Sequence, residues 1–251
     1  MLRQALPAVI VAGLSLLGLA PAAGAVSCEN TEFDDNRFTV CTVDATTEEL
    51  GLYRAKPDGA PYGHFTFLDQ ALADEGKTLV FGMNAGMYHD DRSPVGHYVE
   101  NGREEMRVIA SAGPGNFGLL PNGVFCIADD SARVFETGDF LKQAPSCNHA
   151  TQSGPMLVID GKLHPRFLPD STSRYIRNGV GTTQDGSRAV FVISQNTVTF
   201  HEFARFFRDG LQLPNALFLD GNISRLYAPE LGRNDLGRRM GPIVAVTKPL
   251  D

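Results

Sequence analysis

Four short segments combine small polar residues with glycine, next to apolar runs that are typical of strands. They contain Asn84, Gln152 with Ser153, Asn178 and Asp220. Strand ends and their loops are places where fixed polar groups can converge on a ligand. Because Asn, Asp, Ser and Gly also favour turns, each segment taken alone is explained more simply as a turn. The four segments together predict a polar ligand site.

Several motifs of other chemistries are present only in part. Residues 113–118 spell G-x-G-x-x-G, but the turn Pro121-Asn122-Gly123 follows where a dinucleotide site needs a helix. Gly76-Lys77-Thr78 matches only the end of a P-loop, and His201-Glu202 lacks the second His of a zincin helix. The six histidines have no metal-ligand spacing. We therefore expect no cofactor and no metal, although acidic loops could hold a bound Ca²⁺ without a motif.

The polar segments need strands to position them. The apolar patterns predict strands over residues 38–43, 79–83, 95–99, 106–110, 123–127, 132–135, 189–194 and 216–219, and a hairpin over residues 155–163. A short helix is expected over residues 66–72, with Thr66 as its cap and Asp69 completing a capping-box pair. A second helix begins at Thr199, where Thr199 and Glu202 fit a capping box and Gly210 is a natural stop.

Composition limits the class of protein. The chain has 251 residues, of which 43% are hydrophobic and 20% charged, so disorder is excluded for most of it. Its 26 Gly and 15 Pro indicate many turns, and hence strands more than long helices. We predict an α+β protein: a single compact domain with mostly antiparallel sheet and a few helices. The net charge of −7 and the absence of a Lys/Arg cluster argue against a nucleic-acid partner.

Residues 1–25 have the order of a secretory signal peptide. Arg3 supplies a positive charge, an apolar stretch follows over residues 6–19, and Ala23-Gly24-Ala25 provides the small-residue cleavage site. An uncleaved anchor helix is the competing interpretation, but the apolar run is shorter than the usual ~20 residues and Pro21 interrupts it. A lipoprotein is a third, prompted by Cys28, although residues 25–27 lack the usual Leu. We predict a periplasmic or secreted protein with no stable membrane insertion after cleavage.

The four cysteines are interpreted in that exported context. An even number in an oxidising compartment favours two disulfides. Sequence order suggests Cys28–Cys41 and Cys126–Cys147, although three connectivities are possible. Free buried thiols are the alternative, and the spacings match no zinc site.

Taken in order, the motifs resemble the phosphodiester glycosidase family, which includes the uncovering enzyme, an N-acetylglucosamine-1-phosphodiester alpha-N-acetylglucosaminidase. The resemblance covers about residues 79–227, and its pattern is most similar to the bacterial branch of the family. The matching segments are Asn84-Ala85-Gly86-Met87, Pro94-Val95-Gly96, Val99-Glu100-Asn101-Gly102, Gly115-Asn116-Phe117, Pro121-Asn122-Gly123-Val124-Phe125, Gln152-Ser153-Gly154-Pro155, Arg177-Asn178-Gly179-Val180-Gly181 and Leu219-Asp220-Gly221. Residues 26–251 would then form a phosphodiester glycosidase-like domain.

The resemblance implies an exported hydrolase that cleaves a sugar-1-phosphodiester at the anomeric carbon and releases a phosphate monoester. Such cleavage passes through an oxocarbenium-like state. The leaving phosphate is already a stable anion, so a cation on the phosphate matters more than a general acid. Arg177 is the first candidate because a guanidinium binds two phosphate oxygens at once, and Arg174 is the second. A surface ion pair is the simpler alternative for Arg177.

The resemblance also implies a carboxylate that activates water or attacks the anomeric carbon. Asp220 is the first candidate because it ends an apolar strand beside glycine, with capping of its own turn as the alternative, and Glu100 is the second. Asn84 is placed with Asp220 and Arg177 in the catalytic group. Further residues would hydrogen-bond sugar hydroxyls, an acetamido group or phosphate: Asn122, Gln152, Ser153, Asn178, Thr182 and Ser224. Tyr88 and Tyr175 could stack on a sugar, and Ser153 has no evident base that would make it a nucleophile.

One departure from the family pattern leaves an alternative open. The family motif often reads Leu-Asp-Gly-Gly-Gly-Ser, whereas this chain has Asn222 and Ile223 before Ser224, which makes the loop bulkier and stiffer. A non-catalytic periplasmic protein that binds carbohydrate or phosphate on the same fold is therefore the second hypothesis. A serine or metal-dependent hydrolase is the third. In the first two hypotheses the partner is a glycan or glycosyl-phosphate small molecule.

Overall fold

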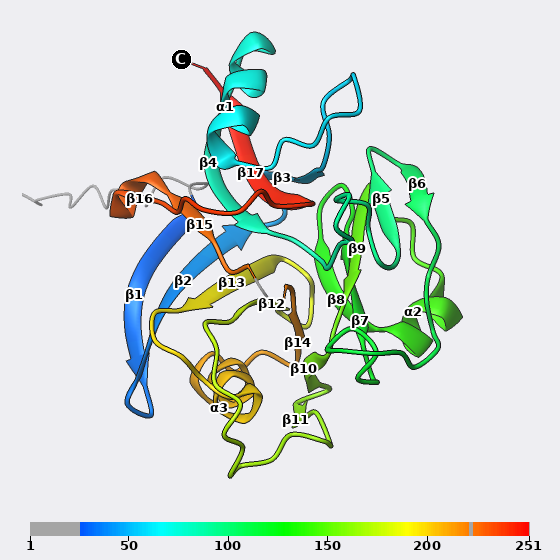
Figure 1. Ribbon diagram of the computed structural model, residues 1–251, viewed down its shortest axis with the longest axis vertical. Coiled ribbons are helices and arrows are strands. Elements are labelled where there is room, and N and C mark those ends of the chain that lie inside the picture. The colour runs from blue at the N-terminus through cyan, green and yellow to red at the C-terminus, as the bar shows by residue number, and fades with distance from the viewer. Residues whose placement is uncertain (1–25, 221–222, 251) are drawn as a thin grey trace, which may run out of the picture.

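Antiparallel strands form most of the protein, as the apolar patterns predict. The computed structural model describes residues 26–220 and 223–250, so the predicted leader over residues 1–25 lies outside the described residues. The strands of the described part form three sheets that pack around a shared core (Figure 1). Helices are few and short there. The predicted α+β class, with mostly antiparallel sheet in one compact domain, is confirmed.

A seven-stranded sheet is the largest layer, in the order β1-β2-β13-β12-β14-β10-β11. Its strands are β1 (Ser27–Phe33), β2 (Asn36–Asp44), β10 (Met156–Ile159), β11 (Lys162–Leu163), β12 (Asn178–Thr182), β13 (Arg188–Ser194) and β14 (Asn215–Phe218). β12 and β14 are antiparallel neighbours in which Gly179 pairs with Phe218. The residues just before β12 and just after β14 therefore lie side by side. This pairing brings Arg177 and Asp220 to the same end of the sheet.

Two five-stranded sheets complete the fold. One has the order β16-β15-β4-β17-β3 and contains β3 (Glu49–Tyr53), β4 (Lys77–Asn84), β15 (Leu226–Ala228), β16 (Arg233–Asn234) and β17 (Ile243–Pro249). The other has the order β6-β5-β9-β7-β8 and contains β5 (Tyr98–Glu100), β6 (Arg103–Met106), β7 (Gly123–Ile127), β8 (Ala132–Glu136) and β9 (His149–Ser153). The latter stands apart as the green group of strands in Figure 1.

The main core lies where the three sheets meet. Phe191 of β13 contacts Phe81 of β4 at 4.9 Å between ring centroids and Phe125 of β7 at 5.8 Å. All three rings are fully buried. Burying one such side chain stabilises a protein by about 1.5–3 kcal/mol, so this contact of three sheets is a principal determinant of how they pack.

The helices cover the outer faces of the sheets. α3 (Phe200–Arg205) begins with the predicted capping box, in which Thr199 and Glu202 each accept from the other's backbone N–H. It continues as a π-helical turn, η1 (Phe206–Gly210), and its aromatic side chains pack on the seven-stranded sheet. η2 (Pro229–Leu231) is a short 3₁₀ turn.

The predicted cap of the first helix is wrong. α1 (Phe65–Asp74) has His64 as its N-cap, with no side-chain hydrogen bond. Asp69 instead accepts from the N–H of Leu79 at 2.8 Å and so ties the helix to β4. α2 (Thr137–Gln143) was not predicted. Its cap is Glu136, a type less common at this position than Ser, Thr, Asp or Asn.

Some strand predictions are also wrong. Only Tyr98 and Val99 of residues 95–99 lie in a strand, and β6 ends at Met106, where the predicted strand begins. The backbone of Ile109 is held by a side chain instead of a strand. Its N–H donates to Oε1 of Gln152 at 3.0 Å and its carbonyl accepts from Nε2 at 2.8 Å. β1, β3, β12 and β17 are strands that the patterns did not predict.

The structure contains both disulfides between cysteines that are adjacent in sequence order. Cys28–Cys41 joins paired positions of β1 and β2. Cys126–Cys147 joins β7 to the segment before β9. Disulfides persist in oxidising compartments, so both bridges fit a protein outside the cytosol.

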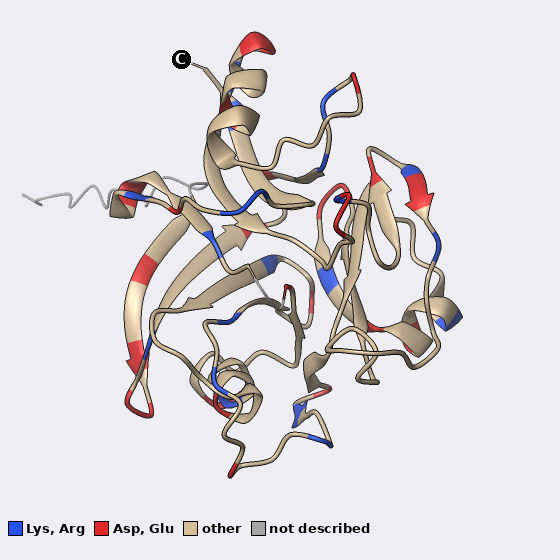
Figure 2. Cartoon of the chain, viewed as in Figure 1, with Lys and Arg blue, Asp and Glu red and all other residues tan. Residues whose placement is uncertain are grey.

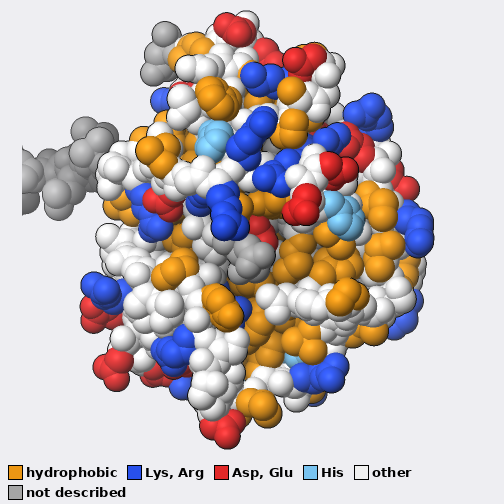
Figure 3. All heavy atoms as spheres, viewed as in Figure 1, with side chains coloured by type: hydrophobic (Ala, Val, Ile, Leu, Met, Phe, Trp, Pro, Cys, Tyr) orange, Lys and Arg blue, Asp and Glu red, His pale blue; other side chains and the backbone are white. Residues whose placement is uncertain are grey.

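Charges of both signs are dispersed over the surface. Lys and Arg are interspersed with Asp and Glu along the ribbon (Figure 2), and apolar side chains are exposed between them on the face in Figure 3. In the described part of the chain, no helix has the length and apolar character needed to cross a membrane.

Candidate active site

Two adjoining hollows share Tyr88 and Asp220. The larger, called the large cleft, has a volume of about 450 Å³ and is lined by Met87, Tyr88, Val95, Gly115, Asn116, Ser173, Tyr175, Arg177, Phe200 and Asp220. The smaller, called the small pocket, has a volume of about 150 Å³ and is lined by Tyr88, His89, Asp90, Arg92, Asp220, Ile223 and Arg238. Asp220 is only 8% exposed. A nearly buried carboxylate thus stands at the junction of the two hollows.

Asp220 is held in place through its neighbour, Leu219. The N–H of Leu219 donates to the carbonyl of Asn178 at 3.2 Å. The hydroxyl of Ser153 donates to the carbonyl of Leu219. Other segments therefore fix both the N–H and the carbonyl of Leu219. This positions the carboxylate of Asp220 just after the end of β14.

A buried amide network holds the chain on the other side of Asp220. Asn84 and Asn178 are fully buried, and Nδ2 of Asn84 donates to Oδ1 of Asn178 at 3.3 Å. Nδ2 of Asn178 donates to the carbonyl of Asn84 at 3.2 Å. Ser224 donates from its hydroxyl to Oδ1 of Asn178 at 3.3 Å, and the N–H of Arg225 donates to Oδ1 of Asn84 at 2.9 Å. Three of the predicted polar segments thus converge, and their side chains bind one another below the cleft.

Arg177 forms a wall of the large cleft. Its Nε donates to the carbonyl of Val198 at 3.0 Å and its Nη2 to the carbonyl of Ser173 at 3.1 Å. Its guanidinium carbon lies 3.6 Å from the centroid of the Phe200 ring, a cation–π contact. Burial lowers the pKa of Arg177 to about 10, so the group stays charged at neutral pH. The ion pair considered as the alternative role of Arg177 is formed by Arg174, the second candidate, whose Nη1 lies 2.9 Å from Oε1 of Glu202.

Tyr88 separates the two hollows. Burial, followed by the negative charge of Asp220, raises the pKa of its hydroxyl to about 12, against the opposing charges of Arg92 and Arg225. The phenol is therefore neutral at physiological pH. Gly241 lies against the ring so closely that a Cβ there would stand 2.4 Å from Cγ of Tyr88. Only glycine fits at this approach.

The other predicted carboxylate lies elsewhere. Glu100 does not line either hollow; it accepts from the Tyr98 hydroxyl at 2.6 Å and from the N–H of Arg54 at 3.2 Å. Burial raises its pKa above the ordinary value. Of the two candidates, Asp220 is therefore the one placed to meet a ligand in the cleft.

Two further predicted residues act on loops around the cleft. Gln152 accepts from the N–H of His97 and binds the backbone of Ile109, as described above. Asn122 donates to the carbonyl of Phe117 at 3.1 Å and accepts from the Thr137 hydroxyl at 2.7 Å. Asn122 thus ties down the loop that carries Asn116 into the cleft.

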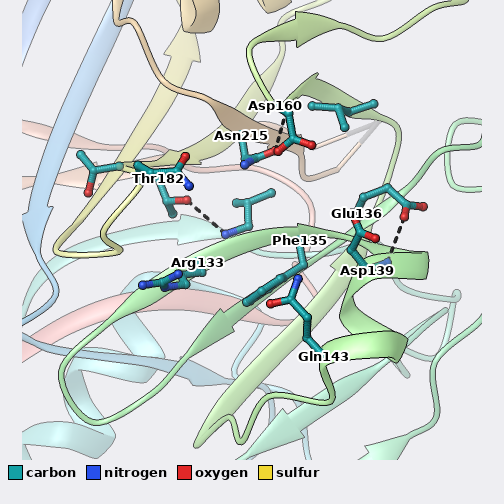
Figure 4. A pocket seen from close by; sticks show the side chains of 12 residues that line it. Arg133, Phe135, Glu136, Asp139, Gln143, Asp160, Thr182 and Asn215 are labelled. Atoms are coloured by element: carbon teal, nitrogen blue, oxygen red, sulfur yellow. Dashed lines mark hydrogen bonds between the residues drawn. The ribbon is translucent and has the colours of Figure 1, made fainter.

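Thr182 lines a different cavity of about 160 Å³. Its hydroxyl accepts from the N–H of Val134 at 3.1 Å. Figure 4 shows the cavity between β8, α2 and the ends of β12 and β14, with Arg133, Asp160 and Asn215 around it. The structure therefore does not bring Thr182 together with Asp220.

Several lining residues were not named as site residues from the sequence, although Asn116 was part of a segment that matches the family. Asn116 belongs to the G-x-G-x-x-G segment, which forms a loop without a following helix. Arg92 and Arg238 belong to polar loops that resemble ordinary solvated turns, so no local signal marks them. Within residues 26–220 and 223–250, no three or more His, Cys, Asp or Glu residues gather in a way that could hold a metal ion.

Comparisons with known proteins show the family of the chain. The family model described as phosphodiester glycosidase matches residues 77–246. The chain is 35% identical over 205 residues to the "Uncharacterized protein YigE" of Escherichia coli, covering 81% of this chain and 80% of that protein.

Two solved structures share the fold at low sequence identity. One is the zebrafish N-acetylglucosamine-1-phosphodiester alpha-N-acetylglucosaminidase catalytic domain auto-inhibited by its pro-peptide, with a TM-score of 0.59, 13% identity and coverage of 88% of this chain and 82% of that one. The other is a putative exported protein from Burkholderia pseudomallei, with a TM-score of 0.51, 12% identity and coverage of 84% and 74%.

Proposed function

Since the chain belongs to the phosphodiester glycosidase family, we propose that it is an exported hydrolase that cleaves a sugar-1-phosphodiester at the anomeric carbon. One observation carries the proposal within the family: the nearly buried carboxylate of Asp220 faces two hollows, with arginines in the walls of both. A carboxylate beside cations suits a substrate that places an anionic phosphate next to a sugar carbon. The exported location is supported by the apolar leader and by the two disulfides.

The chemistry assigned to this site is a displacement at the anomeric carbon. The bond between that carbon and the phosphate oxygen breaks, and its electron pair leaves with the phosphate monoester. Water supplies the new hydroxyl on the carbon. Asp220 either takes the proton from the attacking water or attacks the carbon first, in which case water then releases the sugar. Positive charge near the leaving phosphate stabilises the transition state in either route.

The large cleft has the side chains that a sugar needs. Tyr175 is 57% exposed beside Arg177 and offers an open aromatic face for a sugar ring. Asn116 and Ser173 supply hydrogen-bonding groups on the same lining. Asn84, Ser153, Asn178 and Ser224 are bonded to the loop and to one another, so we assign them the positioning of Asp220 and not direct contact with substrate.

A second candidate function is binding without catalysis. It is favoured by Ile223, which stands where the family has a glycine and is 9% exposed in a cluster with Tyr62, Phe65 and Met240. Such anchoring could hold the loop in one geometry that binds a glycosyl phosphate but does not turn it over.

The test follows phosphorus by NMR while the mature protein is incubated with the methyl diester of N-acetylglucosamine-1-phosphate and related sugar diesters. Asp220→Asn is compared with Asp170→Asn, an exposed aspartate outside both hollows. We expect methyl phosphate to be released by wild type and Asp170→Asn and not by Asp220→Asn. Release by all three proteins would refute the assignment of Asp220. Tight diester binding with no release by wild type would favour the binding function.

A further inference from the structure

Two arginines on the lining of the small pocket, Arg92 and Arg238, have not yet been assigned a specific role. Arg238 is exposed and, among the residues that the structure describes, forms neither an ion pair nor a hydrogen bond. Arg92 lies on the same lining, next to Asp220 and Tyr88. A pocket of about 150 Å³ has the size to take a phosphoryl group, and two guanidinium groups on its lining are donors that bind phosphate oxygens.

The loop that carries Arg92 is built to place it. Arg92 has a φ of 74°, in the left-handed region that residues other than glycine rarely adopt. The loop is closed by hydrogen bonds from the N–H of Arg92 to the carbonyl of His89 and from the N–H of His89 to the carbonyl of Ser93, both at 2.8 Å. Such backbone conformations persist where the surroundings enforce them, and here the two hydrogen bonds fix the loop from which the Arg92 side chain projects.

The Arg92 guanidinium is only partly engaged. One terminal nitrogen donates to the carbonyl of Asp90, and the group lies 5.4 Å from the centroid of the Tyr88 ring. Its Nε is buried and has no hydrogen-bond partner in the described part of the protein. A buried donor without a partner is unfavourable, so the protein leaves part of the hydrogen-bonding capacity of this guanidinium unused.

Arg177 offers less to an anion. Its Nε and Nη2 donate to backbone carbonyls, and Phe200 covers one face of the guanidinium. Its bonds join the segment of Ser173 to that of Val198, which makes it a structural wall of the large cleft. The difference between Arg177 and the two arginines of the small pocket favours that pocket as the place where phosphate binds.

We propose that the small pocket is the phosphate subsite, in which Arg92 and Arg238 bind the phosphoryl oxygens while the sugar occupies the large cleft. The proposal rests on the proposed function and specifies its substrate geometry. The anomeric carbon then lies at the junction of the two hollows, beside Asp220 and Tyr88. The carboxylates of Asp90, at the exposed rim, and of Asp220 oppose an anion in this pocket, and the hydrogen bonds from the two arginines must outweigh them. Specificity for a phosphodiester over a neutral glycoside arises in this pocket.

The experiment measures methyl phosphate binding by calorimetry, together with hydrolysis of the sugar diester. Arg238→Gln removes one charge at an exposed position. Arg92→Asn removes the other with a residue that tolerates left-handed backbone. Arg239→Gln is the matched control, because Arg239 is exposed, donates to the carbonyl of Pro61 at 3.4 Å and does not line the pocket. Arg177→Lys tests the competing site.

Each pocket variant is expected to weaken methyl phosphate binding about tenfold or more, the usual loss for a hydrogen bond to a charged group. Arg239→Gln binds like wild type. In kinetics, the KM for the sugar diester rises with the loss of binding in the pocket variants and stays at the wild-type value in Arg239→Gln.

The possible results separate this inference from the proposed function. Weakened methyl phosphate binding in both variants, with no diester hydrolysed by wild type, would keep the subsite and refute the hydrolase. Unchanged binding in both Arg92→Asn and Arg238→Gln would overturn the subsite, and so would a loss confined to Arg177→Lys. Absence of any methyl phosphate binding by wild type would overturn it as well.

Discussion

Replacing Asn178 with alanine should loosen the loop that carries Asp220. The side chain is fully buried; it donates to the carbonyl of Asn84 at 3.2 Å and accepts from Nδ2 of Asn84 and the hydroxyl of Ser224, both at 3.3 Å. Alanine removes all three bonds but leaves the backbone bond from Leu219 to residue 178. The change therefore acts on the chain after Asp220 more than on the strand before it.

The size of the effect follows from these contacts. A hydrogen bond contributes about 1 kcal/mol net, and a buried group left without a partner costs about 1–3 kcal/mol. The substitution leaves Nδ2 and the carbonyl of Asn84 without their Asn178 partners in a buried site. Because the original hydrogen bonds are long, we expect the free energy of unfolding to fall by only about 3 kcal/mol. For a protein of this length that loss lowers the Tm by about 6–12 °C.

The assay is denaturant and thermal unfolding with both disulfides oxidised, alongside diester hydrolysis. Asn234→Ala is the control, since Asn234 is exposed and surface substitutions usually stay within about 0.5 kcal/mol. We expect kcat to fall while KM changes little, because the carboxylate is displaced and the cleft walls remain. A loss of stability no larger than that of Asn234→Ala would refute the network as the support of this loop.

Three further predictions test other parts of the structure. Because burial raises the pKa of Tyr88 from 10.0 to about 12, the folded state keeps a proton that the unfolded state loses first; this stability is present below pH 10 and is lost as the pH rises to about 12. Tyr88→Phe should reduce that loss in denaturant midpoints measured across this range, and an identical pH dependence would contradict the assignment. Gly241→Ala places a Cβ 2.4 Å from Cγ of Tyr88, so hydrolysis should fall sharply, whereas Gly113→Ala, whose Cβ would meet nothing nearer than 4.0 Å, should keep wild-type turnover. Replacing Cys126 and Cys147 with serine opens a link with a sequence separation of 21 and should cost about 3 kcal/mol in unfolding free energy; a change under about 1 kcal/mol would show that the unfolded chain gains little freedom from losing this bridge.

Local signals explain the successful predictions. The capping box at Thr199 depends on two side chains three residues apart, and the structure contains both of its bonds. The strand over residues 123–127 is a continuous apolar run, and it matches β7 (Gly123–Ile127). Two of the wrong predictions concern positions where the hydrogen bonds join residues far apart in the sequence and not local neighbours. Asp69 binds Leu79 across the fold and not its own helix start, and Gln152 holds Ile109 where the pattern predicted a strand.

The polar segments were identifiable as a set, but their separate tasks were not. Asn84, Gln152, Ser153, Asn178 and Ser224 are all residues that could bind a sugar. In the structure their side chains bind other parts of the protein. Residue type shows what a side chain can bind, whereas burial and neighbours determine what it does bind.

The sequence alone determined the family resemblance, the class of fold and the choice of Asp220, because strand patterns, turns and motif order are properties of consecutive residues. Only the tertiary structure decided which arginines are engaged by the protein itself and which line the small pocket. Arg177 has its donors turned to Val198 and Ser173 because β12 packs beside the segment before α3. Arg92 and Arg238, 146 residues apart in the chain, line one pocket. The direction of a long side chain depends on what packs around it, and that packing joins segments whose nearness no local pattern records.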